Sequence, residues 1–267
     1  MKNKLIKDSL LFNWRKDDDL FELVSILHNR EEIRFVGGCI RDVLLGNKLT
    51  DIDFAIKCKP DVTKNILIQN GFNVQTQGIN FGSVSTIVNG KKYEITSLRK
   101  DVENFGRFAK IEYTNSWEED SFRRDFTINS IYLSPNGDIF DNFKGIQDIQ
   151  KKRISFIGDV KKRIEEDYLR ILRFIRFLGI FKNPKYKFID LEIVQNNFHK
   201  IRENISNNKI KNELIKIFNM PYFSNCFFLN ENKELKNNII FQNLEKWWIE
   251  DNYQLGLDII YDFKKNR

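Results

Sequence analysis

Two aspartates one residue apart, Asp51 and Asp53, are the side chains of this sequence best suited to hold a metal ion. In an extended strand, residues i and i+2 point to the same face, so both carboxylates would project together. Unpaired carboxylates at this spacing repel each other, and Mg²⁺, which prefers carboxylate oxygens together with substrate phosphates, removes that repulsion. The pair therefore predicts a Mg²⁺ site for phosphoryl transfer. The alternative is two exposed aspartates on an edge strand.

A glycine turn precedes the aspartates, and Arg41, which follows this turn, stands ten residues before Asp51. In the run FVGGCIRD, an apolar strand leads into Gly37 and Gly38 and then into the apparent start of a helix that carries Arg41. Glycines let backbone N–H groups approach a phosphate closely, and a helix N-terminus favours anions. Arg41 can add a charge-assisted contact to a triphosphate. A tight connection without a ligand is the alternative for the glycine pair.

Two further groups fit the same chemistry. Glu94 lies in an expected strand at 93–98 and can face the site as a third carboxylate or a positioning group, or can simply lie on the surface. Arg124, in the run RRDFTIN before an expected strand at 127–133, can grip a ribose and a phosphate. Such arginine runs also occur on ordinary surfaces, so the run supports the site without defining it.

A basic helix is expected over residues 160–180, ending at Gly179. On that helix Asp167 and Arg170 lie three residues apart and can hydrogen-bond each other. A paired carboxylate and guanidinium present acceptors and donors in the pattern of a base edge. Arg173 and Arg176 lie further round the helix, so the four side chains cannot share one face. An ordinary i,i+3 ion pair is the alternative.

The elements that must position these side chains change in character along the chain. The first part mixes helices with strands, and Asn89-Gly90 is a strong hairpin signal. The second part is mostly helical, so the fold class is α+β. The expected helices are 17–30, 61–70, 160–180, 188–200, 208–219 and 240–250, and the expected strands are 33–36, 51–56, 72–77, 83–88, 93–98 and 127–133.

Charge and cysteine usage limit the partners and the compartment. The whole positive excess lies in residues 151–187, which contain 12 Lys and Arg against 4 Asp and Glu, and such a segment suits a polyanion such as nucleic acid or a nucleotide phosphate. A solvated helix face is the alternative. Cys39, Cys58 and Cys226 form neither a CxxC pair nor an even set, which argues against a disulfide framework or a zinc site. Without a signal segment or membrane-length apolar run, the protein is expected to be cytoplasmic with no membrane partner.

The motifs, taken together and in order, resemble the class II tRNA nucleotidyltransferases, which are the CCA-adding enzymes, and the related bacterial poly(A) polymerases. The runs that carry the resemblance are FVGGCIRD, TDIDFAI, FGSVSTIVNGKKYEITSLRKD, RRDFTINSIYL and EEDYLRILRFIRF. They cover about residues 33–180, and ISNNKIKNELIKIF extends the similarity more weakly. The loop DVENFGRFAKIEYTNSWEED is similar to the form found in alphaproteobacterial members.

The resemblance implies a polymerase-β-like nucleotidyltransferase head over residues 1–140, built of a mixed sheet with helices. It further implies an all-α neck over 141–205 that selects the nucleotide and binds RNA, and a reduced helical body over 206–267. Relatives are considerably longer, so the chain is expected to be C-terminally shortened, with the tail that grips the tRNA elbow absent or much reduced. The oligomeric state stays open.

The resemblance also assigns roles to the candidate residues. Asp51 and Asp53 would bind the catalytic Mg²⁺. Glu94 is counted with them as a candidate catalytic carboxylate because of its strand position, not because of the resemblance. Asp167 and Arg170 would imitate a Watson–Crick edge and choose C or A over U and G. The remaining residues would hold the incoming nucleotide: Gly38, Arg41, Arg124, Arg173 and Arg176.

The activity that the resemblance implies is the addition of C, C and A from CTP and ATP to the tRNA 3′ end, without a nucleic-acid template and with release of pyrophosphate. A flexible loop at 100–120 favours full CCA addition, because enzymes that add only CC lack it. Poly(A) synthesis and addition of the terminal A alone are alternatives within the family. An inactive RNA-binding remnant is the alternative outside enzymes.

Overall fold

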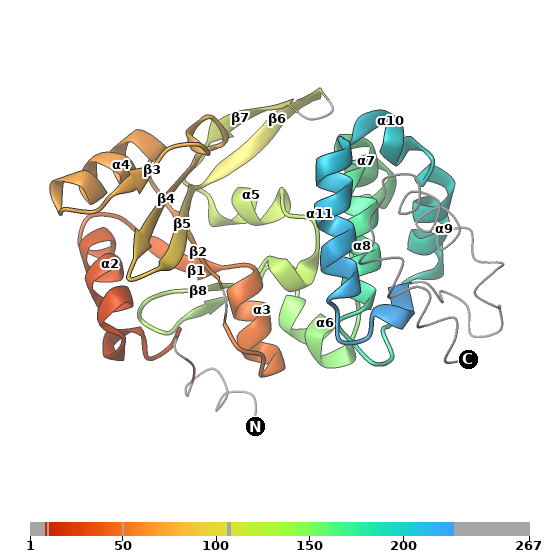
Figure 1. Cartoon of the computed structure of the whole chain (residues 1–267), viewed down its shortest axis with the longest axis horizontal. Helices are drawn as coiled ribbons and strands as arrows, with labels where there is room; N and C mark the ends of the chain where they lie inside the picture. The colour runs from red at the N-terminus through yellow and green to blue at the C-terminus, as the bar shows by residue number, and fades with distance from the viewer. Residues whose placement is uncertain (1–8, 10, 50, 106–107, 227–267) are drawn as a thin grey trace. The chain divides into compact units, whose positions relative to one another are not determined.

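The computed structural model describes residues 9, 11–49, 51–105 and 108–226. The chain divides into two compact units (Figure 1). The first contains residues 1–151 with 155–158, and the second contains residues 152–154 and the chain from residue 159 onward.

A seven-stranded mixed sheet forms the centre of the first unit, in the order β3-β4-β5-β2-β1-β8-β9. β2 and β5 pair in parallel, and every other neighbouring pair is antiparallel. The strands are β1 (Ile33–Val36), β2 (Ile52–Ile56), β3 (Val74–Gln75), β4 (Ser83–Val88), β5 (Lys91–Ser97), β8 (Tyr132–Leu133) and β9 (Ile139–Phe140). The expected mixed α+β class is confirmed.

Helices pack on this sheet through apolar faces. In α2 (Asp18–His28) the buried positions are Leu20, Leu23, Val24 and Leu27, which recur at helical spacing, and Asp17 caps the helix through the Leu20 N–H. α4 (Pro60–Gln69) contacts β3, β4 and β5. The other helical segments of the unit are η1 (Trp14–Lys16), α3 (Gly38–Leu45), η2 (Ile79–Phe81), α5 (Trp117–Phe122), η3 (Thr127–Asn129) and α6 (Gly145–Lys151).

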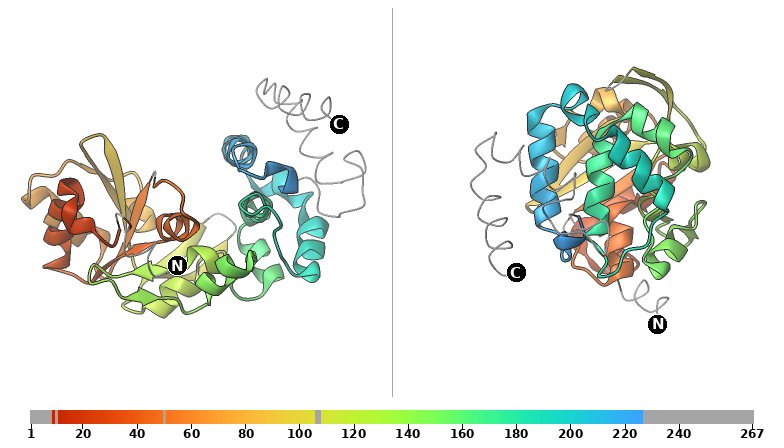
Figure 2. Two further views of the ribbon diagram at one scale, coloured as in Figure 1. Left: turned by 90° about the horizontal axis from the view of Figure 1, so that it is seen from below. Right: turned by 90° about the vertical axis from the view of Figure 1, so that its right-hand side faces the viewer.

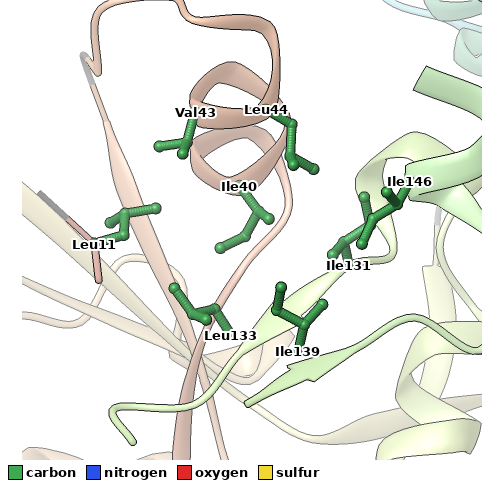
Figure 3. A pocket seen from close by; sticks show the side chains of 8 residues that line it. All are labelled: Leu11, Ile40, Val43, Leu44, Ile131, Leu133, Ile139 and Ile146. Atoms are coloured by element: carbon green, nitrogen blue, oxygen red, sulfur yellow. The ribbon is translucent and has the colours of Figure 1, made fainter. Parts of the chain in front are cut away.

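A group of aliphatic side chains holds α3 on the sheet (Figure 3). They surround a small pocket that the helix shares with the strands β8 and β9, and no charged side chain lines it. The lining residues are Leu11, Ile40, Val43, Leu44, Ile131, Leu133, Ile139 and Ile146. This packing fixes the start of α3, which carries the predicted phosphate-binding turn, relative to the sheet.

Two strand predictions in the first unit are partly wrong. Of the strand expected at 127–133, only Tyr132–Leu133 is extended, and Thr127–Asn129 forms a 3-10 turn. The turn forms because the Asp125 carboxylate accepts hydrogen bonds from the Phe126 N–H and the Asn129 side chain. Of the strand expected at 72–77, only Val74–Gln75 is paired. The predicted hairpin turn at Asn89-Gly90 is confirmed, since both residues have positive φ.

A separate two-stranded hairpin occupies the segment for which a flexible loop was expected. It consists of β6 (Arg99–Phe105) and β7 (Phe108–Tyr113), with α5 following. Figure 1 shows the hairpin beside α5, with which β6 makes contacts. The expected loop therefore contains regular structure on both sides of residues 106–107, which lie outside the described residues.

The segment after residue 140 remains attached to the first unit as far as α6. The Thr127 hydroxyl donates a buried hydrogen bond of 2.7 Å to Asp148 in α6. Gly145 packs so closely on Thr127 that an added Cβ would lie 2.1 Å from its carbonyl oxygen. The division into head, neck and body at residues 140 and 205 stays a prediction about function.

The described part of the second unit is helical (Figure 2). Its helices are α7 (Val160–Glu166), α8 (Leu169–Leu178), α9 (Phe188–Asn197), α10 (Lys200–Asn204), α11 (Asn207–Phe218) and η4 (Phe223–Cys226). The helix expected at 240–250, and most of the expected body at 206–267, lie outside the described residues. Within the described residues, no helix has both the length and the apolar character needed to cross a membrane.

The single helix expected over 160–180 is wrong, because Asp167 interrupts it. Asp167 has extended backbone angles, φ −154° and ψ 104°, between α7 and α8. Its carboxylate accepts a 3.0 Å hydrogen bond from the N–H of Leu169 and so satisfies a donor at the start of α8. The apolar periodicity continues across this break, which is why the sequence pattern does not reveal it.

Candidate active site

The parallel pairing of β2 and β5 brings Asp53 and Glu94 together. The two residues are directly in register, so their side chains lie on the same face of the sheet. Asp51 is exposed and stands immediately before β2, two positions from Asp53. The three carboxylates that were predicted to act together thus lie at the start of β2, for Asp51 and Asp53, and on the adjacent strand β5, for Glu94.

Asp53 carries a charge that its surroundings oppose. Burial raises the pKa of the Asp53 carboxyl to about 6, and the negative charges of Glu94 and Asp51 add to this rise, while Arg124 and Lys92 act against it. A divalent cation would relieve both the burial cost and the repulsion between carboxylates. Hard carboxylate oxygens are the donors that Mg²⁺ prefers, so these residues fit such an ion. Among the residues that the structure describes, no group of three His, Cys, Asp or Glu side chains forms a ready metal cage.

The glycine turn connects β1 to α3 beside this carboxylate group. Gly37 has φ 78° and ψ −128°, a conformation that favours glycine, and Gly38 is the first residue of α3. The Cys39 thiol lies 3.2 Å from the carbonyl oxygen of Val36 and 3.9 Å from that of Asp53, so the helix start lies against the β2 backbone. The first N–H groups of a helix have no intrahelical acceptors and attract anions.

Arg41, in the first turn of α3, hydrogen-bonds to the side chains of Asn129 and Asp42. Its Nη1 donates a 2.7 Å hydrogen bond to Oδ1 of Asn129, and its Nε and Nη2 each lie 3.1 Å from the Asp42 carboxylate. Asn129 in turn donates through Nδ2 to Asp125 at 3.3 Å. Asn129 therefore links the RRDFTIN segment to the glycine turn.

Arg124 lies against the same turn. A Cβ added to Gly37 would lie 3.6 Å from Nη1 of Arg124. The guanidinium donates through Nε to the Tyr132 hydroxyl at 2.9 Å and through Nη2 to Oδ2 of Asp120 at 3.1 Å. The positive charge of Arg124 also offsets part of the rise in the pKa of Asp53. The first unit thus brings the predicted residues Gly38, Arg41, Asp51, Asp53, Glu94 and Arg124 into one region.

Three further residues of this region were not predicted from the sequence: Asp120, Asn129 and Tyr132. Asp120 lies three and four residues before the two arginines, a helical spacing that indicates a pairing only once α5 is known to extend to Phe122. Asn129 and Tyr132 reach Arg41 and Arg124 through the folding of the chain, and no sequence pattern marks those contacts.

In the second unit, the side-chain pair expected between Asp167 and Arg170 is wrong. The Arg170 guanidinium instead donates through Nη1 to Glu166 at 2.5 Å and to the carbonyl oxygen of Arg163 at 2.6 Å. Asp167 and Arg170 are linked only through the backbone, by a 3.0 Å bond from the Arg170 N–H to the Asp167 carbonyl. The reason is the break at Asp167, which turns its carboxylate to the N-terminus of α8.

The two later arginines of α8 lie in different surroundings. Arg176 forms an ion pair with the buried Glu213 of α11, with 2.5 Å between Nε and Oε1, and its guanidinium covers the Phe177 ring at 4.4 Å. The guanidinium of Arg173 lies 5.6 Å from the same ring. Arg176 therefore ties α8 to α11 inside the second unit.

Comparison with known proteins places the first unit in a family. Residues 33–155 match the model of the poly A polymerase head domain. The chain is 43% identical over 149 residues to the human mitochondrial CCA tRNA nucleotidyltransferase 1. The matched segment makes up 55% of this chain and 34% of the human protein. It is 42% identical over 158 residues to a CCA-adding enzyme of Streptococcus pyogenes, and this segment makes up 58% of this chain and 38% of the streptococcal protein.

Solved structures agree in fold. The crystal structure of the Bacillus stearothermophilus CCA-adding enzyme in complex with CTP has a TM-score of 0.69 at 27% identity, covering 79% of this chain and 51% of that one. A tRNA nucleotidyltransferase complexed with a primer tRNA and an incoming ATP analog has a TM-score of 0.65, covering 83% and 62%, and at 24% identity it shows the fold alone.

The mixed sheet with its glycine turn and paired aspartates is a nucleotidyltransferase-type head of the poly A polymerase class. The similarity is the one that the motif order predicted: residues 33–155 match the poly A polymerase head domain, and the matching relatives are named CCA tRNA nucleotidyltransferase and CCA-adding enzyme. It spans 34% of the length of the human relative and 38% of the streptococcal one.

Proposed function

We propose that this protein is a CCA tRNA nucleotidyltransferase. It would add C, C and A from CTP and ATP to the 3′ end of tRNA, without a nucleic-acid template, and release pyrophosphate. The observation that carries the proposal is the placement of Asp53 in register with Glu94, beside a glycine turn that Arg124 contacts. The relatives that share these segments bear the names of CCA-adding enzymes.

Asp51 and Asp53 would hold Mg²⁺ at the edge of the sheet. When bound, the metal would supply activation of the attacking hydroxyl and charge stabilisation at the phosphate. Glu94, on the neighbouring strand, would serve as a third carboxylate that positions the reacting groups. The raised pKa of Asp53 supports the assignment, because strongly perturbed pKa values cluster at functional sites and a bound cation would relieve the burial and repulsion that cause this rise.

The glycine turn and its two arginines would receive the triphosphate. The N–H groups at the start of α3, from Gly38 onward, would face the phosphates, with Arg41 and Arg124 supplying positive charge. The RNA 3′-hydroxyl would attack the α-phosphate, and the same arginines would stabilise the charge that develops on the leaving pyrophosphate.

Residues of the second unit would choose the base. Asp167 and Arg170 would present hydrogen-bonding groups to C or A, with Glu166 holding Arg170 in place of the expected pair with Asp167. Arg173 would help to hold the nucleotide. The nucleotide contact expected for Arg176 stays a prediction, and its ion pair with Glu213 gives it a structural role as well.

RNA would bind through positive charge. The basic segment at 151–187 would attract the phosphates of the tRNA acceptor stem and 3′ end. The cytoplasmic location stays a prediction.

Incorporation into defined RNA ends tests the proposal. The purified protein is offered tRNAs that end before CCA or after CC, with CTP and ATP separately and together. Addition of C without ATP, followed by one A when both nucleotides are present, is the expected result. Runs of A would identify a poly(A) polymerase, A on the CC end alone would identify an A-adding enzyme, and RNA retention without any addition would identify the inactive remnant.

A further inference from the structure

We infer that Asp120 and Tyr132 are positioning residues that fix the Arg124 guanidinium against the glycine turn and thereby set the affinity of the site for a nucleoside triphosphate. The inference rests on the proposed function, because it assigns Arg124 to the triphosphate. It concerns two residues that the sequence motifs do not single out.

Three side chains form a closed cycle of hydrogen bonds. The Tyr132 hydroxyl accepts from Nε of Arg124 at 2.9 Å and donates to Oδ2 of Asp120 at 2.7 Å. The same Oδ2 accepts from Nη2 of Arg124 at 3.1 Å. Two nitrogens on one edge of the planar guanidinium are thus held, which fixes its plane and leaves Nη1 toward Gly37.

The Asp120 carboxylate is itself immobilised. It is fully buried, and its other oxygen, Oδ1, accepts from Nε of Arg123 at 2.9 Å and from the N–H of Arg99 at 3.3 Å. Burial raises the pKa of Asp120, but the charges of Arg124 and Arg123 outweigh it and bring the pKa to about 2. The carboxylate therefore stays charged, and hydrogen bonds to buried charged groups are among the strong ones.

The hydrogen-bonded cycle lies next to the end of β1, where the glycine turn begins. Tyr132 of β8 is in register with Val36, the last residue before Gly37. The Tyr132 ring packs edge-on against Trp117, with centroids 5.5 Å apart, and belongs to a buried cluster with Val36, Ala55 and Leu98. Packing thus uses the ring, whereas the hydroxyl hydrogen-bonds only to Asp120 and Arg124 within the part of the chain that the structure describes.

Tyr132→Phe is the sharpest test, since it keeps the packed ring and removes only the hydroxyl. Calorimetry without RNA measures the affinity for CTP in the wild-type protein, in Tyr132→Phe, in Arg124→Met and in the double variant. Thr127→Val is the matched control, because it removes a buried 2.7 Å hydrogen bond to Asp148 from the same segment without touching Arg124. Melting temperature and RNA retention are recorded for each.

The expected result is about a tenfold loss of CTP affinity in Tyr132→Phe, the size of one hydrogen bond to a charged group. The control should bind CTP as the wild-type protein does, and RNA retention should be unchanged. In the Arg124→Met background, Tyr132→Phe should have no further effect, because the two residues would act as one unit. Should Tyr132→Phe fail to fold, Asp120→Asn takes its place in the same cycle.

Equal CTP affinity in folded Tyr132→Phe, or a full second loss in the double variant, overturns the inference. If the wild-type protein binds CTP and the variants weaken it, but no nucleotide is added to tRNA, the proposed function fails while the positioning role stands. If the wild-type protein binds no CTP, both fail.

Discussion

The side chain of Arg41 donates a 2.7 Å hydrogen bond from Nη1 to Oδ1 of Asn129, which lies 88 residues later in the chain. Asn129 cannot rotate freely, because its Nδ2 donates to the buried Asp125 carboxylate. The amide therefore presents its oxygen to Arg41 and its nitrogen to Asp125. This hydrogen bond connects the run FVGGCIRD to the run RRDFTINSIYL.

Asn129→Ala should weaken nucleotide binding, because Arg41 loses the acceptor that orients it. We expect about a fivefold to tenfold loss of affinity for CTP and ATP, the size of one hydrogen bond to a charged group. Calorimetry measures it. Asn142→Ala is the control, since Asn142 donates only a 3.3 Å bond to Ser121. Equal losses in both variants would show that general loosening, and not the orientation of Arg41, sets the affinity.

Asp53→Asn should stabilise the protein at neutral pH while it removes a proposed metal ligand. The folded-state pKa of Asp53, about 6, lies above the ordinary value of 3.8, so the folded protein binds more protons than the unfolded chain between these values. The contribution of Asp53 to stability therefore falls as pH rises from about 4 to 6. At pH 7, without Mg²⁺, the substitution should add on the order of 2 kcal/mol to the free energy of unfolding.

Urea unfolding at pH 4 and pH 7, without divalent ions, measures this effect. The gain from Asp53→Asn should be clear at pH 7 and small at pH 4. Added Mg²⁺ should stabilise the wild-type protein more than the variant. A variant less stable than the wild-type protein at pH 7 would show that the Asp53 charge is compensated within the fold.

Glu166→Gln should blur base selection, because Glu166 holds the Arg170 guanidinium at 2.5 Å in place of the expected Asp167. Arg170→Ala should strongly blur the choice of CTP and ATP over UTP and GTP, and Glu166→Gln should blur it less, because the guanidinium itself remains. Competition between nucleotides in single-nucleotide incorporation measures both. Mg²⁺ dependence serves as the internal control and should not change. If nucleotide selectivity is unchanged in Arg170→Ala, Arg170 has only a structural role, through its ion pair with Glu166.

Arg176→Met should destabilise the second unit. The substitution leaves Glu213, whose side chain is 4% exposed, without its closest positive partner. Breaking a buried ion pair on one side costs about 3 kcal/mol, and chemical denaturation measures it. Lys216→Met is the control, since Lys216 lies 3.8 Å from Glu213 and is 56% exposed, and an exposed partner contributes less than about 1 kcal/mol. A loss of nucleotide affinity without a loss of stability would instead support the nucleotide contact expected for Arg176.

Local patterns predicted the parts of the site that lie within one element. The alternation of a strand places Asp51 and Asp53 on one side, and the glycine pair marks the start of α3. The neighbourhood of Asp53 and Glu94 depends on the parallel pairing of β2 with β5, whereas a sequence pattern shows only that each is a strand. The fold that pairs these two strands was predicted from the family resemblance of the motifs, because the strand patterns alone do not show which strands are neighbours.

Long-range contacts explain what was missed. Asp120 and Tyr132 meet Arg124 only in the folded chain, and their residue types are unremarkable in sequence. The helix break at Asp167 was hidden because a side-chain cap can interrupt a helix without disturbing its apolar period. Because of this break, the Arg170 guanidinium hydrogen-bonds to the carboxylate of Glu166 and not to that of Asp167.

The most direct test of the central claim, that Asp51 and Asp53 hold the metal on which nucleotide transfer depends, is pyrophosphate release measured across a Mg²⁺ titration. The wild-type protein and the double variant Asp51→Ala/Asp53→Ala are compared on a tRNA lacking CCA with CTP and ATP, and RNA retention is recorded in parallel. We predict Mg²⁺-dependent release from the wild-type protein, and none from the double variant at any Mg²⁺ concentration while RNA retention stays nearly intact. Unchanged release from the double variant would contradict the account.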